Sequence, residues 1–237
     1  MKKVLMTGST QGIGLAIAER FVKEGYAVIV HCSRDEAKAE RVKNEIGAAG
    51  AVACDLSDLS AAAKLKEKTG PLDILILNAS VQFKNKWDAV SVEELQKQVT
   101  VNVESTMVLM QEYIPEMREN GFGRIVTIGS VNQYNNHPEL TVYSATKCAV
   151  ESLVRNIAKQ EAKYGITVNN VAPGAIHTPR NQSVYDDPQM REFVENKIPL
   201  RRFGEPQEIA GTVLLLCGAD GAYITGADIK IDGGMSL

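Results

Sequence analysis

The run Val4-Leu-Met-Thr-Gly-Ser-Thr-Gln-Gly-Ile-Gly14 joins a short apolar segment to a glycine-rich turn. The apolar segment predicts a buried strand, and apolar residues at helical spacing from Ile13 to Val22 predict a helix. Glycine lets the backbone turn tightly and approach a pyrophosphate, whose charge is met by N–H groups and the positive end of the helix dipole. The stretch therefore predicts a dinucleotide site, although its Gly-x-x-x-Gly-x-Gly spacing differs from the commoner Gly-x-Gly-x-x-Gly.

Short strand-like runs alternate with helix-length segments along the whole chain. The predicted strands are 3–7, 27–31, 51–54, 72–77, 123–129, 166–171 and 228–232. Their apolar composition suits strands buried on both faces, so the pattern predicts an α/β fold: one Rossmann domain over 1–237, with a doubly wound, seven-stranded parallel sheet and helices on both faces. Ligands of such sheets bind beyond the carboxyl ends of the strands. The residues that follow strands one to six at that edge include Gly8, Arg34, Asp55, Asn78, Ser130 and Pro173.

A hydroxyl, a phenol and an ammonium recur at a suggestive spacing in the middle of the chain. Ser130 stands thirteen residues before Tyr143, which opens the run Tyr-Ser-Ala-Thr-Lys147. In a helix predicted over 142–164, Tyr143 and Lys147 share one face, and the ammonium can lower the pKa of the phenol. Lowering it from about 10 to about 7 requires about 4 kcal/mol and brings it into the range of general acid/base catalysis. Ser130 could then bind a substrate oxygen on which charge develops. The alternative is that these are surface residues of an amphipathic helix.

Taken in order, these motifs resemble the short-chain dehydrogenase/reductase family over essentially the whole chain. The matching pieces are Thr7-Gly-Ser-Thr-Gln-Gly-Ile-Gly14, Asp55, Asn78-Ala79, Asn102, Gly123-Arg-Ile-Val-Thr-Ile-Gly-Ser130, Tyr143 with Lys147, Asn170-Val-Ala-Pro-Gly174 and Ile231-Asp-Gly-Gly234. Within the family, the segment from Pro173 to Ile209 is similar to glucose 1-dehydrogenases, and much of the remainder to 3-oxoacyl-carrier-protein reductases. The resemblance implies an NAD(P)(H)-dependent oxidoreductase that interconverts a ketone and a secondary alcohol, on either a sugar or polyol or a 3-oxoacyl-type carbonyl. A catalytically idle nucleotide sensor or scaffold on the same fold is the alternative.

The resemblance also implies roles for individual residues. The expected catalytic residues are Asn102, Ser130, Tyr143 and Lys147, with Asn102 holding a water that relays protons to Lys147. The expected cofactor-binding residues are Gly8, Ser9, Gln11, Gly12, Ile13, Gly14, Ser33, Arg34, Asp55, Leu56, Asn78, Ala79, Tyr143, Lys147, Pro173, Gly174, Ile176 and Thr178. The family usually has Asn-Ala-Gly where this chain has Asn78-Ala-Ser80, so a left-handed backbone at Ser80 would cost about 1 kcal/mol relative to glycine.

The end of the second strand bears on the choice between NADP(H) and NAD(H). An acidic residue there binds the adenosine ribose hydroxyls, whereas a basic residue accommodates a 2′-phosphate. Cys32 stands where NAD-preferring relatives usually carry Asp, and Ser33-Arg34 resembles the phosphate-accepting version. Gln11, where many NADP-preferring relatives have a basic residue, and the acidic Asp35 argue in the other direction. We expect NADP(H) to be favoured, with NAD(H) as the alternative.

Composition argues against several other function classes. A net charge of −3 with interspersed signs gives no electrostatic footprint for nucleic acid. The apolar run after Lys3 is too short for a signal peptide or a membrane span, so we expect a cytoplasmic protein that acts on a small molecule. The histidines lack metal-ligand spacing, so no metal is expected. The scattered cysteines are expected to be reduced and mostly buried; they are Cys32, Cys54, Cys148 and Cys217.

Three further features bear on the substrate and on assembly. The amide-rich loop 132–137 could recognise hydroxyl groups or could be a polar surface loop. The segment 175–203 holds three prolines and no confident element, and it predicts a substrate lid. The family resemblance implies a homotetramer or a homodimer, joined through helices at about 90–118 and 142–164 and through the last strand. An apolar stripe of the second helix could face the sheet or another subunit; it consists of Ala149, Leu153 and Ile157.

Overall fold

The apolar runs of the sequence form the strands of one parallel sheet in the computed structural model, which describes residues 1–237. The strands are β1 (Lys3–Met6), β2 (Ala27–Cys32), β3 (Gly50–Ala53), β4 (Ile74–Leu77), β5 (Gly123–Ile128), β6 (Ile166–Pro173) and β7 (Asp228–Ile231). Their order is β3-β2-β1-β4-β5-β6-β7, so the direction of winding reverses between β1 and β4. This confirms the predicted doubly wound, seven-stranded sheet, and such a reversal is where ligands bind in these folds.

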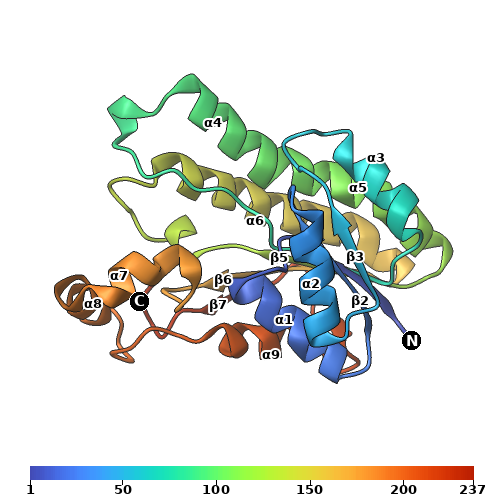
Figure 1. Ribbon diagram of the computed structural model, residues 1–237. Coiled ribbons are helices and arrows are strands. Elements are labelled where there is room, and N and C mark those ends of the chain that lie inside the picture. Colours follow the sequence, from blue (N-terminus) through green and yellow to red (C-terminus); the bar gives the residue numbers. More distant parts are fainter.

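Helices cover both faces of the sheet (Figure 1). One layer consists of α1 (Gly12–Lys23), α2 (Glu36–Ile46) and α9 (Pro206–Cys217), and the other of α3 (Ala61–Thr69), α5 (Ser105–Glu119) and α6 (Thr141–Glu161). Each layer packs its own hydrophobic core against the strands. On the α6 side the core includes Tyr113 and Val154, and on the α1 side it includes Phe21 and Val213. Burial on both faces explains why the strands are apolar throughout.

The helix predicted at about 90–118 is present over 92–119, and it contains a π-helical turn that the prediction did not include. α4 (Val92–Val99) begins at a capping box made by Ser91 and Glu94. It continues through a π-helical turn, η2 (Thr100–Glu104), into α5. A π turn has i→i+5 hydrogen bonds in place of i→i+4, and such turns are frequent at functional sites. The helix predicted at 142–164 is confirmed as α6 followed by a 3₁₀ turn, η4 (Ala162–Tyr164).

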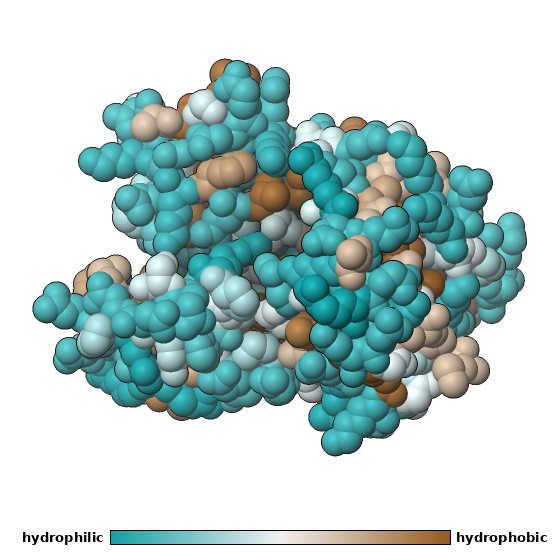
Figure 2. Space-filling view, viewed as in Figure 1, coloured by the Kyte–Doolittle hydropathy of each residue, from teal (hydrophilic) through white to brown (hydrophobic).

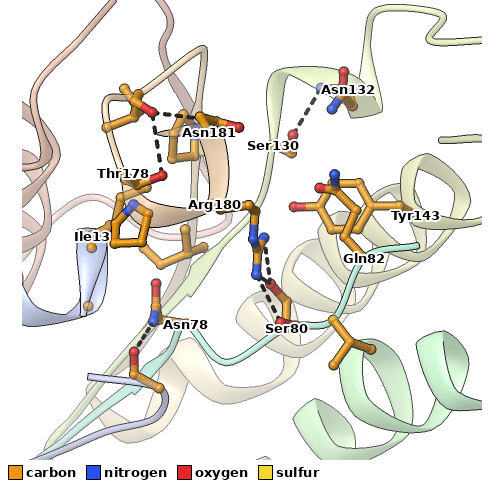
Figure 3. A pocket seen from close by; sticks show the side chains of 18 of the residues that line it. Ile13, Asn78, Ser80, Gln82, Ser130, Asn132, Tyr143, Thr178, Arg180 and Asn181 are labelled. Atoms are coloured by element: carbon orange, nitrogen blue, oxygen red, sulfur yellow. Dashed lines mark hydrogen bonds between the residues drawn. The ribbon is translucent and has the colours of Figure 1, made fainter. Parts of the chain in front are cut away.

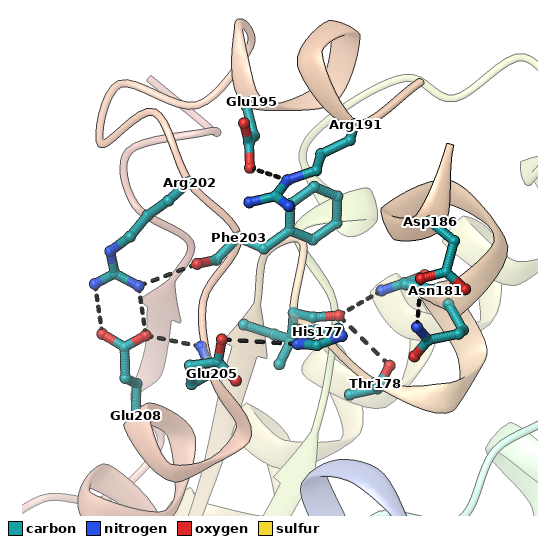
Figure 4. Close-up of polar contacts among 12 residues, drawn as sticks. His177, Thr178, Asn181, Asp186, Arg191, Glu195, Arg202, Phe203, Glu205 and Glu208 are labelled. Carbon is teal, nitrogen blue, oxygen red and sulfur yellow. Dashed lines mark hydrogen bonds and ion pairs between the residues drawn. The ribbon is translucent and has the colours of Figure 1, made fainter. Parts of the chain in front are cut away.

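The segment predicted to lack regular structure, 175–203, carries three short helices. They are η5 (Pro179–Asn181), α7 (Gln182–Asp186) and α8 (Pro188–Glu195). Both ends of the segment meet at one point, where Ile176 and Gly204 pair as a parallel bridge and the His177 N–H donates to the Gly204 carbonyl at 2.8 Å. His177 also stacks on Tyr185 with ring centroids 3.7 Å apart, and it lies close to Glu205 (Figure 4). The segment therefore leaves and rejoins the rest of the domain at one place, where Ile176 pairs with Gly204.

The exposure of the cysteine side chains tests the prediction made for them. All four cysteines are free, but Cys148 is exposed and Cys32 and Cys54 are half-buried, so the prediction that most thiols are buried is wrong and only Cys217 is buried. Cys148 lies on the outer face of α6, which hydrophobic composition alone cannot identify.

No group of three or more His, Cys, Asp or Glu side chains is arranged to hold a metal ion. None of the helices combines the length and apolar character that crossing a membrane requires.

Candidate active site

A cavity of about 760 Å³ opens at the carboxyl ends of the strands. Figure 2 shows this face hollowed between the part that carries α4 and the part that carries α7 and α8. Most of the predicted site residues line it: Gly8, Gln11, Gly12, Ile13, Gly14, Ser33, Arg34, Asp55, Leu56, Asn78, Ala79, Ser130, Tyr143, Lys147, Pro173, Gly174, Ile176 and Thr178. Ser9 and Asn102 are the two that do not. The topology thus gathers residues from six strand ends into one site.

The glycine turn after β1 has a geometry that only glycine permits. Gly12 has a φ of +56°, and a Cβ on Gly14 would lie 2.4 Å from the Gly8 carbonyl oxygen. No side chain caps the start of α1, so its first N–H groups remain available at the cavity. Close backbone approach and an open helix N-terminus are the features that suit a pyrophosphate. The turn therefore fits the predicted dinucleotide.

Ser9 supports this turn from behind and does not contact the cavity. It is fully buried, its hydroxyl donates to the Met6 carbonyl at 2.8 Å, and it accepts from the His31 N–H at 2.9 Å. The hydroxyl is thus used inside the fold, and the predicted cofactor contact of Ser9 stays a prediction. Asn78 braces the turn from the other side, donating to the carbonyls of Thr7 and Gly8 at 3.0 and 2.9 Å.

Two cationic side chains follow β2 and line the cavity, Arg34 in the loop and Lys38 at the start of α2. Arg34 donates to the Asp55 carboxylate at 2.7 Å, so the residue predicted to bind a phosphate is paired with the residue predicted to bind adenine. Burial raises the pKa of Asp55, but hydrogen bonds from Ser57 and Arg34 outweigh it and hold the pKa below its usual value. Lys38 also lines the cavity and donates to Gln11 at 2.9 Å. Sequence analysis missed Lys38, although its place four residues after Arg34 at the start of α2 is a usable signal.

The hydroxyl, phenol and ammonium predicted to act together do meet. Ser130 follows β5, and Tyr143 and Lys147 lie one turn apart on α6 with 5% and 4% of their surface exposed. The Lys147 Nζ lies 5.5 Å from the centroid of the Tyr143 ring and donates to the Ile128 carbonyl at 2.7 Å. The alternative that these are surface residues is therefore wrong.

Electrostatics favour ionisation of the phenol. Burial raises the pKa of Tyr143, but the charges of Lys147 and Arg180, together with the hydroxyls of Ser130 and Ser80, lower it below its ordinary value of about 10. Burial and Arg180 also lower the pKa of Lys147, although Tyr143 opposes them. The pair can thus exchange a proton more readily than an isolated tyrosine near neutral pH.

Asn102 joins two backbone segments that border the site. Its side chain accepts from the Val81 N–H at 2.9 Å and donates to the Val81 carbonyl at 2.9 Å and to the Thr146 hydroxyl at 3.1 Å. It therefore ties the segment after β4 to the turn of α6 between Tyr143 and Lys147. The predicted role of Asn102 in holding a water stays a prediction.

Ser80 and Arg180 form a contact that sequence analysis missed. Arg201 is the one non-glycine residue with a positive φ, so Ser80 carries none of the left-handed strain considered for it. The guanidinium of Arg180 donates to the Ser80 carbonyl at 2.9 Å and to its hydroxyl at 3.2 and 3.3 Å (Figure 3). Both residues line the cavity. Nothing local in the sequence links positions that are 100 residues apart.

Some residues of the amide-rich loop 132–137 line the cavity, and others form hydrogen bonds with the rest of the protein. Asn132 and His137 line the cavity. Gln133 instead donates to the Asp228 carboxylate at 2.8 Å, and Asn135 donates to the Met235 carbonyl at 3.0 Å. Only part of the loop is therefore available to a substrate.

Comparison with known proteins agrees with this geometry. A family model described as "Enoyl-(Acyl carrier protein) reductase" matches residues 8–236. Glucose 1-dehydrogenase of Gluconobacter oxydans is 38% identical over 245 residues, which cover 100% of this chain and 92% of that protein. A 3-oxoacyl (acyl-carrier-protein) reductase of Agrobacterium tumefaciens C58, solved with NADP bound, has a TM-score of 0.94 and 34% identity, covering 98% of this chain and 93% of that one. A blue fluorescent protein from a metagenomic library, solved in complex with NADPH, has a TM-score of 0.92 and 29% identity, covering 100% and 98%. Since the family model and these relatives span nearly the whole chain, the protein belongs to the short-chain dehydrogenase/reductase family and is an oxidoreductase.

Proposed function

We propose that the protein is an NADP(H)-dependent oxidoreductase that interconverts a ketone and a secondary alcohol, with Tyr143 as the proton-transferring group. The observation that carries this proposal is the burial of Tyr143 and Lys147 side by side, next to Ser130, in the cavity that also contains the glycine turn. When bound, the nicotinamide supplies or accepts the hydride.

The residues of the cavity fit a phosphorylated dinucleotide. Gly12 and Gly14 allow close approach of a pyrophosphate at the uncapped start of α1. Arg34 and Lys38 offer two cations beside Asp55 for the adenosine end, which favours a 2′-phosphate over a plain ribose. The relatives solved with NADP or NADPH support the same choice.

The proton chemistry follows from the geometry of three side chains. In the direction of reduction, the Tyr143 phenol gives its proton to the carbonyl oxygen, and the Ser130 hydroxyl donates a hydrogen bond to the same oxygen. The Lys147 ammonium stabilises the phenolate that remains. In the direction of oxidation, the phenolate takes the proton from the alcohol. A lowered phenol pKa serves both directions, since a group that titrates nearer to neutrality can both give and take a proton.

The similar proteins offer two substrate classes, a sugar or polyol and a 3-oxoacyl compound. The segment 175–203 is proposed as the lid over either of them. Its helix α8 places Met190, Phe193 and Val194 in the cavity lining, and the first two are exposed. Exposed apolar side chains above a polar site are suited to close over a ligand and exclude water.

The test is to follow the absorbance of reduced nicotinamide with NADPH and with NADH, offering sugars, polyols, 3-oxo esters and simple ketones. Turnover with NADPH is expected, and Tyr143→Phe should bind NADPH normally yet lose at least about 100-fold in kcat. Tyr223→Phe, at a fully exposed position, is the matched control. Undiminished turnover by Tyr143→Phe would contradict the assigned role. Cofactor binding without turnover of any compound would favour an idle sensor.

A homotetramer is proposed for the assembly. α6 buries Val150, Val154 and Ala158 within its own subunit, whereas its neighbouring apolar stripe stays half-buried. That stripe consists of Ala149, Leu153 and Ile157. A half-buried apolar row on a long helix suits a second subunit. The cytoplasmic location stays a prediction.

A further inference from the structure

Arg180 brings a guanidinium into the cavity with no acidic partner. It lies on η5 after β6, and its hydrogen bonds go to the carbonyl and hydroxyl of Ser80 alone. No carboxylate lies within ion-pair distance of it. Its Nε makes no hydrogen bond and its Nη1 makes one, so N–H donors remain for a ligand. A cation held by neutral groups beside a reactive site is a natural anion receptor.

The charge of Arg180 reaches the reacting groups. It contributes to lowering the pKa of both Tyr143 and Lys147. The Ser80 hydroxyl that holds it also favours the Tyr143 phenolate. Figure 3 shows the Arg180 side chain extending to Ser80, with Tyr143 to one side of it. An anion bound to Arg180 would therefore share the cavity with a carbonyl placed at Tyr143.

The surroundings of Arg180 add positive charge. Lys84, Lys97 and Lys197 line the same cavity, are exposed and form no ion pair. After burial, the charges of Lys84 and Lys197 lower the pKa of His137, which places both near that ring. The acidic side chains of the lining are Glu139 and Asp55, and Asp55 is paired with Arg34. A cavity lined mainly by one sign of charge concentrates ligands of the opposite sign.

We propose that Arg180, held in place by Ser80, binds a carboxylate of the substrate, so that the preferred substrates are keto acids and hydroxy acids rather than neutral ketones and alcohols. This inference rests on the proposed function, because it places the carboxylate relative to the carbonyl reduced at Tyr143. Guanidinium binds carboxylate through paired, charge-assisted hydrogen bonds, which fixes orientation as well as affinity. The unpaired lysines at the mouth attract the same anion from solution.

The test compares each acid with its own ester. Acetoacetate and methyl acetoacetate, then levulinate and methyl levulinate, are reduced with NADPH, and the ratio of kcat/KM for acid over ester is measured. The wild-type ratio is expected to exceed 1, and Arg180→Gln should lower it about 10- to 100-fold. Arg180→Lys should retain part of the preference, and Ser80→Ala should lower the ratio less than Arg180→Gln does. The ratio is used because Arg180 also contributes to lowering the pKa of Tyr143. A change in that pKa alters the reduction of acid and ester together, so it cancels in the ratio.

Two controls keep the result specific. Arg41→Gln removes one charge from α2 outside the cavity and should leave the ratio unchanged. Calorimetry of malonate and dimethyl malonate binding to the NADP⁺-loaded enzyme measures the same preference without turnover. Malonate should bind more tightly than its ester, and Arg180→Gln should weaken malonate at least about 10-fold. Circular dichroism melting shows whether each variant is folded.

The outcomes separate this inference from the proposed function. Ester turnover with no acid preference, and malonate bound no better than its ester, would keep the function and overturn the carboxylate site. Malonate binding that depends on Arg180, with no ketone reduced, would keep the site and contradict the function. If Arg180→Gln weakens NADPH binding at least 10-fold and leaves the ratio unchanged, the guanidinium serves the cofactor phosphates and the inference is wrong.

Discussion

The ammonium of Lys147 lies 5.5 Å from the centroid of the Tyr143 ring, and both side chains are almost completely buried. Despite burial, the net effect of Lys147 and Arg180 is a lowered pKa for Tyr143. Ketone reduction uses the protonated phenol, so its kcat/KM should fall as the pH rises through this lowered pKa. Alcohol oxidation uses the phenolate and should rise over the same interval. Opposite pH profiles in the two directions, with a shared midpoint below pH 10, are the expected result.

Lys147→Met should move that midpoint upwards. The variant removes the cation that lowers the phenol pKa most, so oxidation should require a higher pH and fall about 100-fold or more near neutrality. Lys159→Met removes an exposed cation from the same helix and serves as the control. An unchanged pH profile in Lys147→Met would show that the ammonium does not tune the phenol.

His31 makes the stability of the protein depend on pH. Its Nδ1 accepts from the Gly8 N–H at 3.0 Å, and its Nε2 donates to the Cys54 carbonyl at 2.9 Å. Burial lowers the pKa of His31 to about 4. Between about pH 6.5 and pH 4 the unfolded chain binds a proton that the folded protein does not, so stability should fall as the pH falls, by up to about 3 kcal/mol.

Urea unfolding at several pH values checks this contribution. His31→Gln should be less stable at pH 7 and should lose most of the decline between pH 6.5 and pH 4. His137→Gln, at the cavity, is the comparison, because that ring is only half-buried. Equal slopes of stability against pH in the wild type and in His31→Gln would contradict the assignment.

Asp228 is expected to position Ser130 from a distance. Its carboxylate accepts from the side-chain amides of Gln133 and Asn170, both at 2.8 Å, and the side-chain Oε1 of Gln133 accepts from the Ser130 N–H at 3.2 Å. Asp228→Asn would place a side-chain NH₂ group opposite one of these two NH₂ donors. The lost hydrogen bond would cost about 1 to 3 kcal/mol of stability and release the loop that carries Ser130.

A fall of about 10-fold in kcat with an unchanged NADPH affinity is the expected signature of Asp228→Asn. Asp220→Asn, at an exposed position, should change neither quantity. If KM for the ketone rises while kcat is constant, Asp228 affects substrate binding and does not position the hydroxyl.

The strands and the catalytic pair could be predicted because local patterns encode them. A strand buried on both faces has to be an apolar run, and a tyrosine and a lysine four residues apart have to share a helix face. Parallel topology then brings strand ends together, so Gly8 and Ser130 share a cavity although they are distant in sequence.

What the sequence did not reveal depends on tertiary contacts and on side-chain direction. Arg180 meets Ser80 only because the fold brings η5 to the residues that follow β4, and no spacing rule links the two positions. Ser9 belongs to a glycine motif, yet its hydroxyl points into the protein. The apolar pattern predicted a helix through Asn102, but nothing in that pattern indicated the π turn there.

Lys38 should contribute to the choice of cofactor. It stands beside Arg34 at the adenosine end of the cavity, where a 2′-phosphate would add a charge that NADH lacks. Lys38→Ala is expected to weaken NADPH binding about 10-fold and to leave NADH binding within about 3-fold, as measured by fluorescence titration. Lys43→Ala, which lies on the same helix and pairs with Glu40, is the control. Equal losses for both cofactors would exclude a contact with the 2′-phosphate.

Leu153 tests the proposed assembly. It is half-buried on α6, beside Val154, which is buried within the subunit. A carboxylate at position 153 would be buried in a subunit interface without a partner, and an uncompensated buried charge is strongly destabilising. Sedimentation velocity should therefore show a tetramer for the wild type and smaller species for Leu153→Asp. Asn156→Asp adds the same charge at an exposed position of α6 and should stay tetrameric. A monomeric wild type would contradict the tetramer, and a tetrameric Leu153→Asp would place the interface on another surface.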